Sequence, residues 1–232
     1  MDNRFLKNDP TIIRLGTVTC AALKNRIIAA AGCAAFLLVV LNLPGPSAFL
    51  DRFIDPATGH LHLFFDEHWG LKSDTISFGH DIEGSWLLLE AADRIDDPAL
   101  LQRVRQASLR MAEAVLAAGL DTDGGLFNEA GPQGLLDRGK DWWPQAEALV
   151  GFLNAWAHSD DARFYTAATH SWAFIEKYLL DATLGEWRWG VDRAGQPDPA
   201  ADKVSLWKCP YHNGRACLEG LRRLNKAGEP GV

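Results

Sequence analysis

The sequence predicts an all-α fold, in which helical hairpins joined by short β-hairpins stand side by side as an α/α toroid. Three observations support this fold class. A glycine-flanked, aromatic-rich segment recurs three times after residue 48, each copy precedes a stretch with helical periodicity, and polar and aromatic side chains gather where each stretch begins. Units repeated in this way stack into an open solenoid or close into a toroid. The shared polar end favours closure, and a solenoid with a concave binding face is the alternative.

The repeated unit opens with a short strand or hairpin. The three segments are Gly59–Phe65, Gly124–Glu129 and Gly185–Trp189. Glycines at the ends of a short aromatic run mark turns on either side of extended chain. We therefore expect a β-hairpin before each of the first-type helices.

Two types of helix follow these segments. The first type is expected at about 77–95, 142–158 and 211–224, where apolar residues recur at i, i+3, i+4 and i+7. The second type is expected from Asp97-Pro98 to Ala118, and from Ser159-Asp160-Asp161 to Leu180. Asp or Ser before the first turn accepts unpaired backbone N–H groups, and proline fits the first helical position.

The first-type helices align at His80, Pro144 and His212, so their polar beginnings fall at one end of the fold. The residues gathered there are His80, Asp81, Glu83, Trp142, Trp143, Gln145, Glu147, Tyr211, His212 and Arg215. A closed barrel would bring these side chains into one pocket.

Composition limits the classes of protein. With 47% hydrophobic and 23% charged residues, the 232-residue chain can bury one sizeable core or two small ones. A net charge of −7 argues against a nucleic-acid partner, which needs a basic surface. The nine tryptophans fit either sugar stacking or a Trp-rich core, and Trp86, Trp156 and Trp172 are expected in the core because they fall mid-helix.

The first 48 residues differ from the rest, because they contain no Trp, Tyr, His or Glu. They form an atypical apolar N-terminal segment, 1–48, ahead of the main region, 49–232. The apolar run 27–41 is short for a membrane span. An export signal or anchor through residues 24–43 competes with a buried helix of unusual sequence.

The polar end carries groups suited to proton transfer. His80 and His212 occupy equivalent places in two units, with Glu83 and Glu147 close by and Trp143 and Trp207 flanking them. An imidazole both accepts and donates a proton near neutral pH. Two histidines in one cavity suit a reaction that removes a proton from one face and returns it to the other, whereas a histidine at a helix N-terminus can also be a cap. No metal site is predicted: His60, His62 and His68 alternate, but no Cys or carboxylate stands at a fixed spacing from them.

Three strings resemble the cellobiose 2-epimerases of the N-acylglucosamine 2-epimerase family. They are Ser77–Glu83 (SFGHDIE), Trp142–Glu147 (WWPQAE) and Trp207–Cys217 (WKCPYHNGRAC). The resemblance runs from about Phe49 to Leu224. It implies an (α/α)6 barrel of six helical hairpins, of which this chain holds about three, as the C-terminal half of an epimerase-type barrel.

The resemblance implies cofactor-independent epimerisation at C2 of the reducing-end glucose of cellobiose, lactose or a related β-1,4 disaccharide, through a cis-enediolate. His80 and His212 would be the catalytic acid/base pair. Glu83 and Glu147 would orient the histidines and the sugar hydroxyls, and Trp143 and Trp207 would stack on the sugar rings. No metal and no cofactor are implied, and a cytoplasmic location is expected.

The sequence departs from the family in its first part. Family members carry an arginine and a third pocket histidine there, and the histidine would fall near Ala21, where residues 1–48 contain none. An active epimerase that covers an open half-barrel by self-association is therefore one hypothesis. A non-catalytic family remnant with at most sugar binding is another, as is a different sugar epimerase or isomerase of the family. An α/α-barrel glycoside hydrolase would need two opposed carboxylic acids as its catalytic pair.

Overall fold

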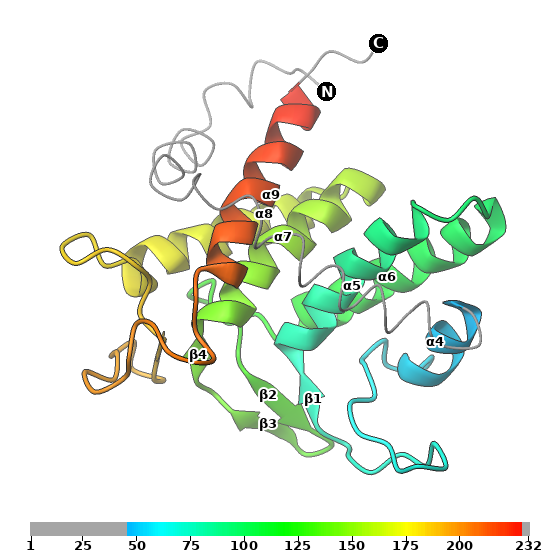
Figure 1. The fold of residues 1–232 in the computed structure, drawn as a ribbon, viewed down its shortest axis with the longest axis horizontal. Helices are drawn as coiled ribbons and strands as arrows, with labels where there is room; N and C mark the ends of the chain where they lie inside the picture. The colour runs from blue at the N-terminus through cyan, green and yellow to red at the C-terminus, as the bar shows by residue number, and fades with distance from the viewer. Residues whose placement is uncertain (1–45, 229–232) are drawn as a thin grey trace.

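The computed structural model describes residues 46–228, so the apolar run, residues 24–43 and the position of Ala21 lie outside the described residues. The described region consists mainly of helices, with a few short strands between them (Figure 1). The elements are α4 (Pro46–Phe53), β1 (Ile76–Ser77), α5 (Phe78–Ala92), α6 (Pro98–Ala118), β2 (Glu129–Gly131), β3 (Gly134–Asp137), β4 (Lys140–Asp141), α7 (Trp142–Ser159), α8 (Ala162–Phe174), the π-helical turn η1 (Ile175–Leu179), β5 (Gly190–Val191) and α9 (Tyr211–Gly228). Helix α4 spans the boundary predicted between residues 48 and 49.

The helices form an inner and an outer set. Helices α5, α7 and α9 lie next to one another in chain order, α6 packs on α5, and α8 packs on α7 (Figure 1). The structure thus contains two complete helical hairpins, and α9 is the inner helix of a third whose outer helix is not among residues 46–228. The short strands gather at the end where the inner helices begin.

The predicted caps of the outer helices are confirmed. The Asp97 carboxylate accepts hydrogen bonds from the backbone N–H groups of Ala99 and Leu100, and Pro98 opens α6. Asp161 caps α8 by accepting from Arg163 N. The second outer helix reaches the predicted end near Leu180, but from Ile175 onward it is a π-helical turn.

The predicted strands needed correction. Apart from Glu129, which begins β2, the segments 59–65, 124–129 and 185–189 make only isolated bridges, such as Leu120 with Leu126 and Leu180 with Trp187. The pairing strands lie elsewhere: β1 pairs with β2, β2 with β3, and β4 with β5.

A glycine turn explains this difference. Gly59, Gly124 and Gly185 have φ values of 81°, 88° and 69°, a conformation in which L-residues are strained. Each turn begins with an aspartate (Asp55, Asp121, Asp181) whose carboxylate caps a backbone N–H one or two residues on. The recurring feature of the sequence is thus a turn that begins with Asp and contains Gly. The segments on either side of the turn are joined by a single bridge, and they do not form a longer hairpin.

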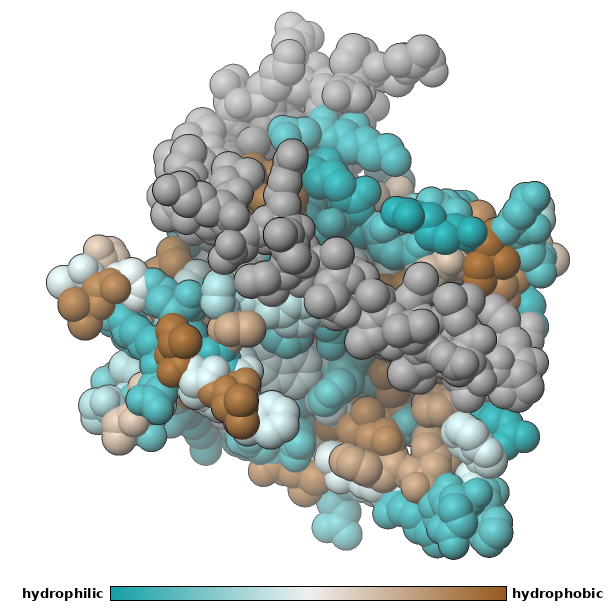
Figure 2. All heavy atoms as spheres, in the orientation of Figure 1, coloured by the Kyte–Doolittle hydropathy of each residue, from teal (hydrophilic) through white to brown (hydrophobic). Residues whose placement is uncertain are grey.

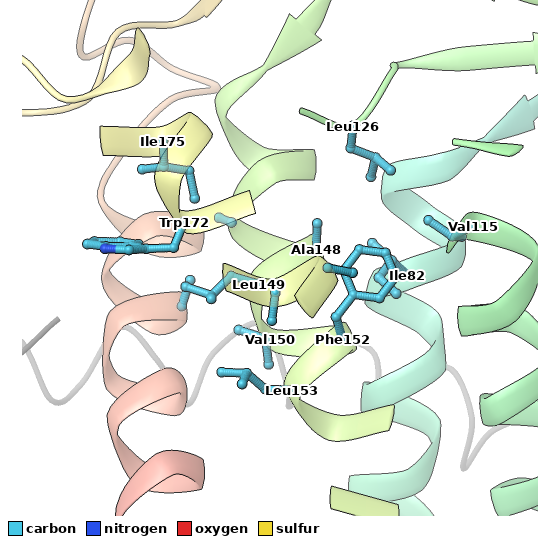
Figure 3. Packing of buried hydrophobic residues seen from close by; sticks show 14 of the residues in the cluster. Ile82, Val115, Leu126, Ala148, Leu149, Val150, Phe152, Leu153, Trp172 and Ile175 are labelled. Carbon is cyan, nitrogen blue, oxygen red and sulfur yellow. The ribbon is translucent and has the colours of Figure 1, made fainter. Parts of the chain in front are cut away.

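The core centres on α7. Leu149, Val150, Phe152 and Leu153 of α7 pack between Ile82 of α5, Val115 of α6 and the Trp172 and Ile175 side chains (Figure 3). Trp86, Trp156 and Trp172 are all buried, as predicted. On the coloured part of the face shown in Figure 2, hydrophobic residues form small separate groups among hydrophilic ones.

Candidate active site

Three aromatic groups meet where the inner helices begin. The ring centroids of His80 and Trp143 are 4.8 Å apart, and those of Trp143 and His212 are 5.6 Å apart. The Tyr211 ring, also from α9, lies 4.6 Å from that of His212. Because α5, α7 and α9 supply one group each, the indole of Trp143 contacts both predicted catalytic imidazoles.

Gly79 makes this arrangement sterically feasible. A Cβ atom at position 79 would lie 2.5 Å from the Trp143 ring, far inside van der Waals contact. The glycine in the SFGHDIE string therefore lets the indole lie directly over the first turn of α5.

A charged layer lies one helical turn below the aromatic groups. Arg215 Nη2 donates to Glu83 Oε1 at 2.6 Å and to Glu147 Oε1 at 2.6 Å. Glu147 also bonds the His212 imidazole (Oε1 to Nδ1, 2.7 Å) and accepts from Trp86 Nε1 at 3.0 Å. The Glu147 side chain has no exposed surface. A buried carboxylate with three donors around it is well satisfied.

The ionisation of this layer follows from its contacts. Burial works to raise the pKa of Glu147, but the hydrogen bond with His212 and the charge of Arg215 hold that pKa below its usual value. The pKa of Glu83 is raised, first by burial and then by the negative charge of Glu147. Burial disfavours the charged guanidinium, yet the charges of Glu147 and Glu83 raise the pKa of Arg215. Glu147 is therefore the more readily ionised of the two carboxylates.

An ionised Glu147 fixes the orientation of His212. A carboxylate only accepts hydrogen bonds, so Nδ1 of His212 is the donor in the 2.7 Å contact. In the neutral imidazole the other nitrogen, Nε2, then carries the free lone pair. His212 is thus prepared to exchange a proton through Nε2.

His80 has a different environment. Its Nδ1 lies 2.7 Å from the hydroxyl oxygen of Ser77, and no carboxylate bonds it. Although part of the residue is open to solvent, the surrounding protein displaces enough water to lower the pKa of His80, and the charge of Asp81 acts in the opposite direction. A neutral His80 can accept a proton.

Three residues of the predicted polar end do not join the pocket. Asp81 binds His60 Nδ1 at 2.7 Å and Leu61 N at 2.7 Å. Gln145 bonds both backbone groups of Leu126, and the Trp142 ring packs 4.6 Å from that of Trp189. Successive positions on a helix are rotated by about 100°. The neighbours of His80 and Trp143 in sequence therefore point toward the turns and strands, and not toward the pocket.

Trp207 lies apart from this cluster. Its side chain is 81% exposed, in the loop that precedes α9, and its backbone N–H donates to Ser205 Oγ at 3.3 Å. The structure brings together His80, Glu83, Trp143, Glu147 and His212, whereas ring stacking by Trp207 stays a prediction.

The sequence pattern placed Arg215 at the polar end but did not predict its hydrogen bonds with Glu83 and Glu147. Glu83, Glu147 and Arg215 each stand three residues after the landmarks His80, Pro144 and His212. They occupy one register on three adjacent helices, and that register was the signal that could have paired them. The contact of Trp86 with Glu147 had no comparable signal, because it depends on how α5 and α7 pack.

The charged layer contains three side chains of the types that bind metal ions. Ligand atoms of Glu83, Glu147 and His212 lie within 4.8 Å of one another, the only such group among residues 46–228. However, Arg215 Nη2 already lies 2.6 Å from an oxygen of each carboxylate. With this guanidinium in place, the three side chains do not fit a metal ion.

Comparison with known proteins also identifies a sugar epimerase family. The sequence profile of the N-acylglucosamine 2-epimerase (GlcNAc 2-epimerase) family matches residues 46–214. The chain is 44% identical over 177 residues to a cellobiose 2-epimerase of Dictyoglomus turgidum, covering 76% of the chain and 45% of that relative. A cellobiose 2-epimerase of Bacteroides fragilis is 40% identical over 174 residues, covering 75% and 44%. The chain thus spans less than half the length of these curated relatives.

Solved structures agree. The fold matches a sugar epimerase from a ruminal bacterium with a TM-score of 0.71 and 38% identity, covering 75% of the chain and 44% of that structure. It matches the cellobiose 2-epimerase of Bacillus thermoamylovorans with a TM-score of 0.69 and 35% identity, covering 76% and 45%. The architecture is therefore a partial (α/α)6 barrel, as predicted.

Proposed function

Because the chain belongs to the N-acylglucosamine 2-epimerase family, we propose that its site epimerises C2 of the reducing-end glucose of cellobiose, lactose or a related β-1,4 disaccharide, without a cofactor. The observation that carries the proposal is the arrangement of His80 and His212, which both contact the Trp143 ring, with Glu147 bonded to one of them. Two imidazoles with different surroundings suit a proton that leaves one face of a carbon and returns to the other.

The chemistry requires only acid–base groups. After the sugar ring opens, C2 lies next to the C1 aldehyde, and its proton is acidic enough for a neutral imidazole to accept it. The C2–H electron pair then forms the C1–C2 double bond of a cis-enediolate, whose negative charge resides on O1. Rotation about C2–C3 presents the other face, and the second imidazole, in its protonated form, returns a proton to C2. In the reverse reaction the two histidines exchange roles.

The surrounding residues have supporting tasks in this scheme. Glu147 orients His212 and balances its charge when it is protonated. Trp143 offers the apolar surface against which an open or closed sugar would lie. Trp207, exposed in the loop before α9, would reach the second sugar ring. The matched region is less than half of each relative, so we propose epimerase activity for this chain separately from the activity that the relatives' names give.

The test is to incubate the protein with cellobiose in D2O and to follow C2 by NMR. We expect the mannose-ended epimer with deuterium at C2, abolished by His80→Ala and by His212→Ala. His68→Ala is the matched control, because the His68 side chain is 86% exposed and remote from the site. Binding of cellobiose with no epimer and no exchange would replace the proposal with a sugar-binding role.

We also propose that copies of this chain associate through the region around the loop before α9. Leu206 is 92% exposed and Val204 is 63% exposed, so water contacts two apolar side chains in this loop besides Trp207. Sedimentation equilibrium of the protein and of Leu206→Ser would test this, with a monomer at every concentration as the contrary result.

None of the helices in the described part of the chain, residues 46–228, has both the length and the apolar character of a membrane span.

A further inference from the structure

We propose that Arg215 is the built-in cation of this site: its guanidinium takes the place that a divalent metal ion would otherwise take between Glu83 and Glu147, and so keeps Glu147 oriented toward His212. The inference deepens the proposed function and partly rests on it. Arg215 contacts Glu83, Glu147 and the rings of Trp86 and Tyr211, so its role is to position other groups.

The contacts around Arg215 are those of a fixed cation. One guanidinium nitrogen, Nη2, lies 2.6 Å from Glu83 and 2.6 Å from Glu147, and the other, Nη1, donates to the Tyr211 hydroxyl. The guanidinium carbon lies 4.9 Å from the Trp86 ring centroid and 4.4 Å from that of Tyr211. Aromatic faces and paired carboxylates hold a planar guanidinium in one orientation.

Removal of this cation would leave an uncompensated set of ligands. The buried carboxylate of Glu147 and the half-buried one of Glu83 would repel each other, and burial of an unpaired charge is costly. Ligand atoms of Glu83, Glu147 and His212 lie within 4.8 Å of one another. Carboxylate oxygens and imidazole nitrogens are both zinc ligands in proteins, and three protein ligands are enough for a zinc site. The position of Arg215 thus explains how ligands suited to a metal support a site that requires none.

The position of Arg215 also bears on His212. Glu147 Oε1 accepts from both Arg215 and His212, so the guanidinium determines where that oxygen lies. Without the guanidinium, Trp86 still holds Oε2 of Glu147, but Oε1 keeps only His212 as a partner, and we expect this oxygen to lose its fixed position beside the Nδ1–H donor of His212. A small displacement of a catalytic group lowers the rate by about 100-fold.

The closing experiment compares Arg215→Ala with Arg222→Ala. Arg222 lies on the same helix, pairs with Glu90 and Glu219, and its side chain is 51% exposed. Zinc chloride is titrated into each protein by calorimetry. The tautomer of His212 is read from its ¹⁵N NMR shifts, with and without added guanidinium ion. Neither measurement depends on turnover.

We expect one equivalent of Zn²⁺ to bind tightly to Arg215→Ala and to raise its melting temperature, with no such site in the wild type or in Arg222→Ala. We expect the Nδ1–H form of His212 to be lost in Arg215→Ala and restored by millimolar guanidinium. If Arg215→Ala folds only when Zn²⁺ or guanidinium is present, that dependence supports the proposal equally. Equal zinc binding by wild type and Arg215→Ala, an unchanged His212 tautomer, or failure to fold under every condition would each overturn it.

Arg215→Lys adds a kinetic readout. An ammonium keeps the charge but lacks the planar fork. We expect kcat to fall about 100-fold with little change in KM. Wild-type kcat in Arg215→Lys would overturn the positioning role. A wild type without any turnover, but with the expected zinc and tautomer results, would refute the proposed function and leave the role of Arg215 intact.

Discussion

Two buried cations in this chain, Lys140 and Arg215, have closely similar surroundings. Lys140 Nζ lies 2.7 Å from Asp121 and 2.7 Å from Asp123, and Arg215 Nη2 lies 2.6 Å from each of two glutamates. Each cation also lies over two aromatic rings, those of Phe127 and Phe174 for Lys140. Both are almost completely buried.

The carboxylates make the difference. The Asp121 and Asp123 side chains are 32% and 38% exposed, and they belong to the Asp–Gly turn before β2. Glu147 is fully buried and bonds His212 on its other side. The same ion arrangement therefore fastens a turn in one place, and in the other it orients an imidazole. What a buried ion pair does depends on what else its carboxylate touches.

The largest expected effect comes from Glu147→Gln. An amide can donate to His212 Nδ1 and stabilise the wrong tautomer, as a carboxylate cannot. We expect kcat to fall by about 10²- to 10⁴-fold, the range over which acid–base groups contribute. The deuterium-exchange assay measures it. The matched change in the other cluster is Asp121→Asn, which should leave kcat per folded molecule unchanged, and equal activity in both variants would contradict the distinction between the two clusters.

The second effect concerns stability, and it comes from Lys140→Met. The methionine leaves Asp121 and Asp123 without their cation, but both can still reach water. We expect the free energy of unfolding to fall by about 1.5–3 kcal/mol, the usual net contribution of hydrogen bonds to charged groups. Urea denaturation measures this loss, and the activity of the folded fraction should not change.

An exposed lysine provides the control for that measurement. Lys72 pairs with Asp66 at 2.8 Å, but its side chain is 59% exposed. Surface pairs of this kind contribute about 0–1 kcal/mol. If Lys72→Met and Lys140→Met lowered the free energy of unfolding equally, burial of the Lys140 pair would contribute nothing to stability.

The sequence predicted the helices more accurately than the strands, for a physical reason. The capped helices beginning at Pro98 and Ala162 depend on local signals, namely Asp97 and Asp161 before the first turn. The strands depend on which segments meet in space, and β1 pairs with β2 across some 50 residues of chain. The glycines at 59, 124 and 185 signalled the turn correctly, but not how little extended chain would follow it.

The candidate site divides in the same way. His80, Glu83, Trp143, Glu147 and His212 could be grouped because repeat register places them on one end of three adjacent helices. Asp81 and Gln145 shared that end and were still misplaced, because register along the chain does not specify the side of the helix that faces the pocket. The bonds from Arg215 to two other helices depend on tertiary packing, which no local pattern contains.

The smallest expected effect is on acid stability, and it distinguishes the turn cluster most finely. Partial burial works against ionisation of Asp121, but the hydrogen bonds from Lys140 and Thr122 and the charge of Lys140 together outweigh it and hold the pKa of Asp121 below its usual 3.8. A carboxylate with a lowered pKa in the folded state stabilises the protein above its unfolded pKa, and this stabilisation is lost as the pH falls through the folded value.

Lys140→Met removes two of the interactions that lower the pKa of Asp121, namely the hydrogen bond from Lys140 and its positive charge. The difference in unfolding free energy between wild type and Lys140→Met should therefore be largest near neutral pH and should shrink as the pH falls below 3.8 and through the lowered pKa of Asp121. Because Asp121 is partly exposed, added salt should shrink the same difference at neutral pH, whereas it should leave the effect of Arg215→Lys on His212 nearly unchanged. A difference that stayed constant from neutral to acid pH would mean that Lys140 stabilises the turn by packing on Phe127 and Phe174, and not by its charge.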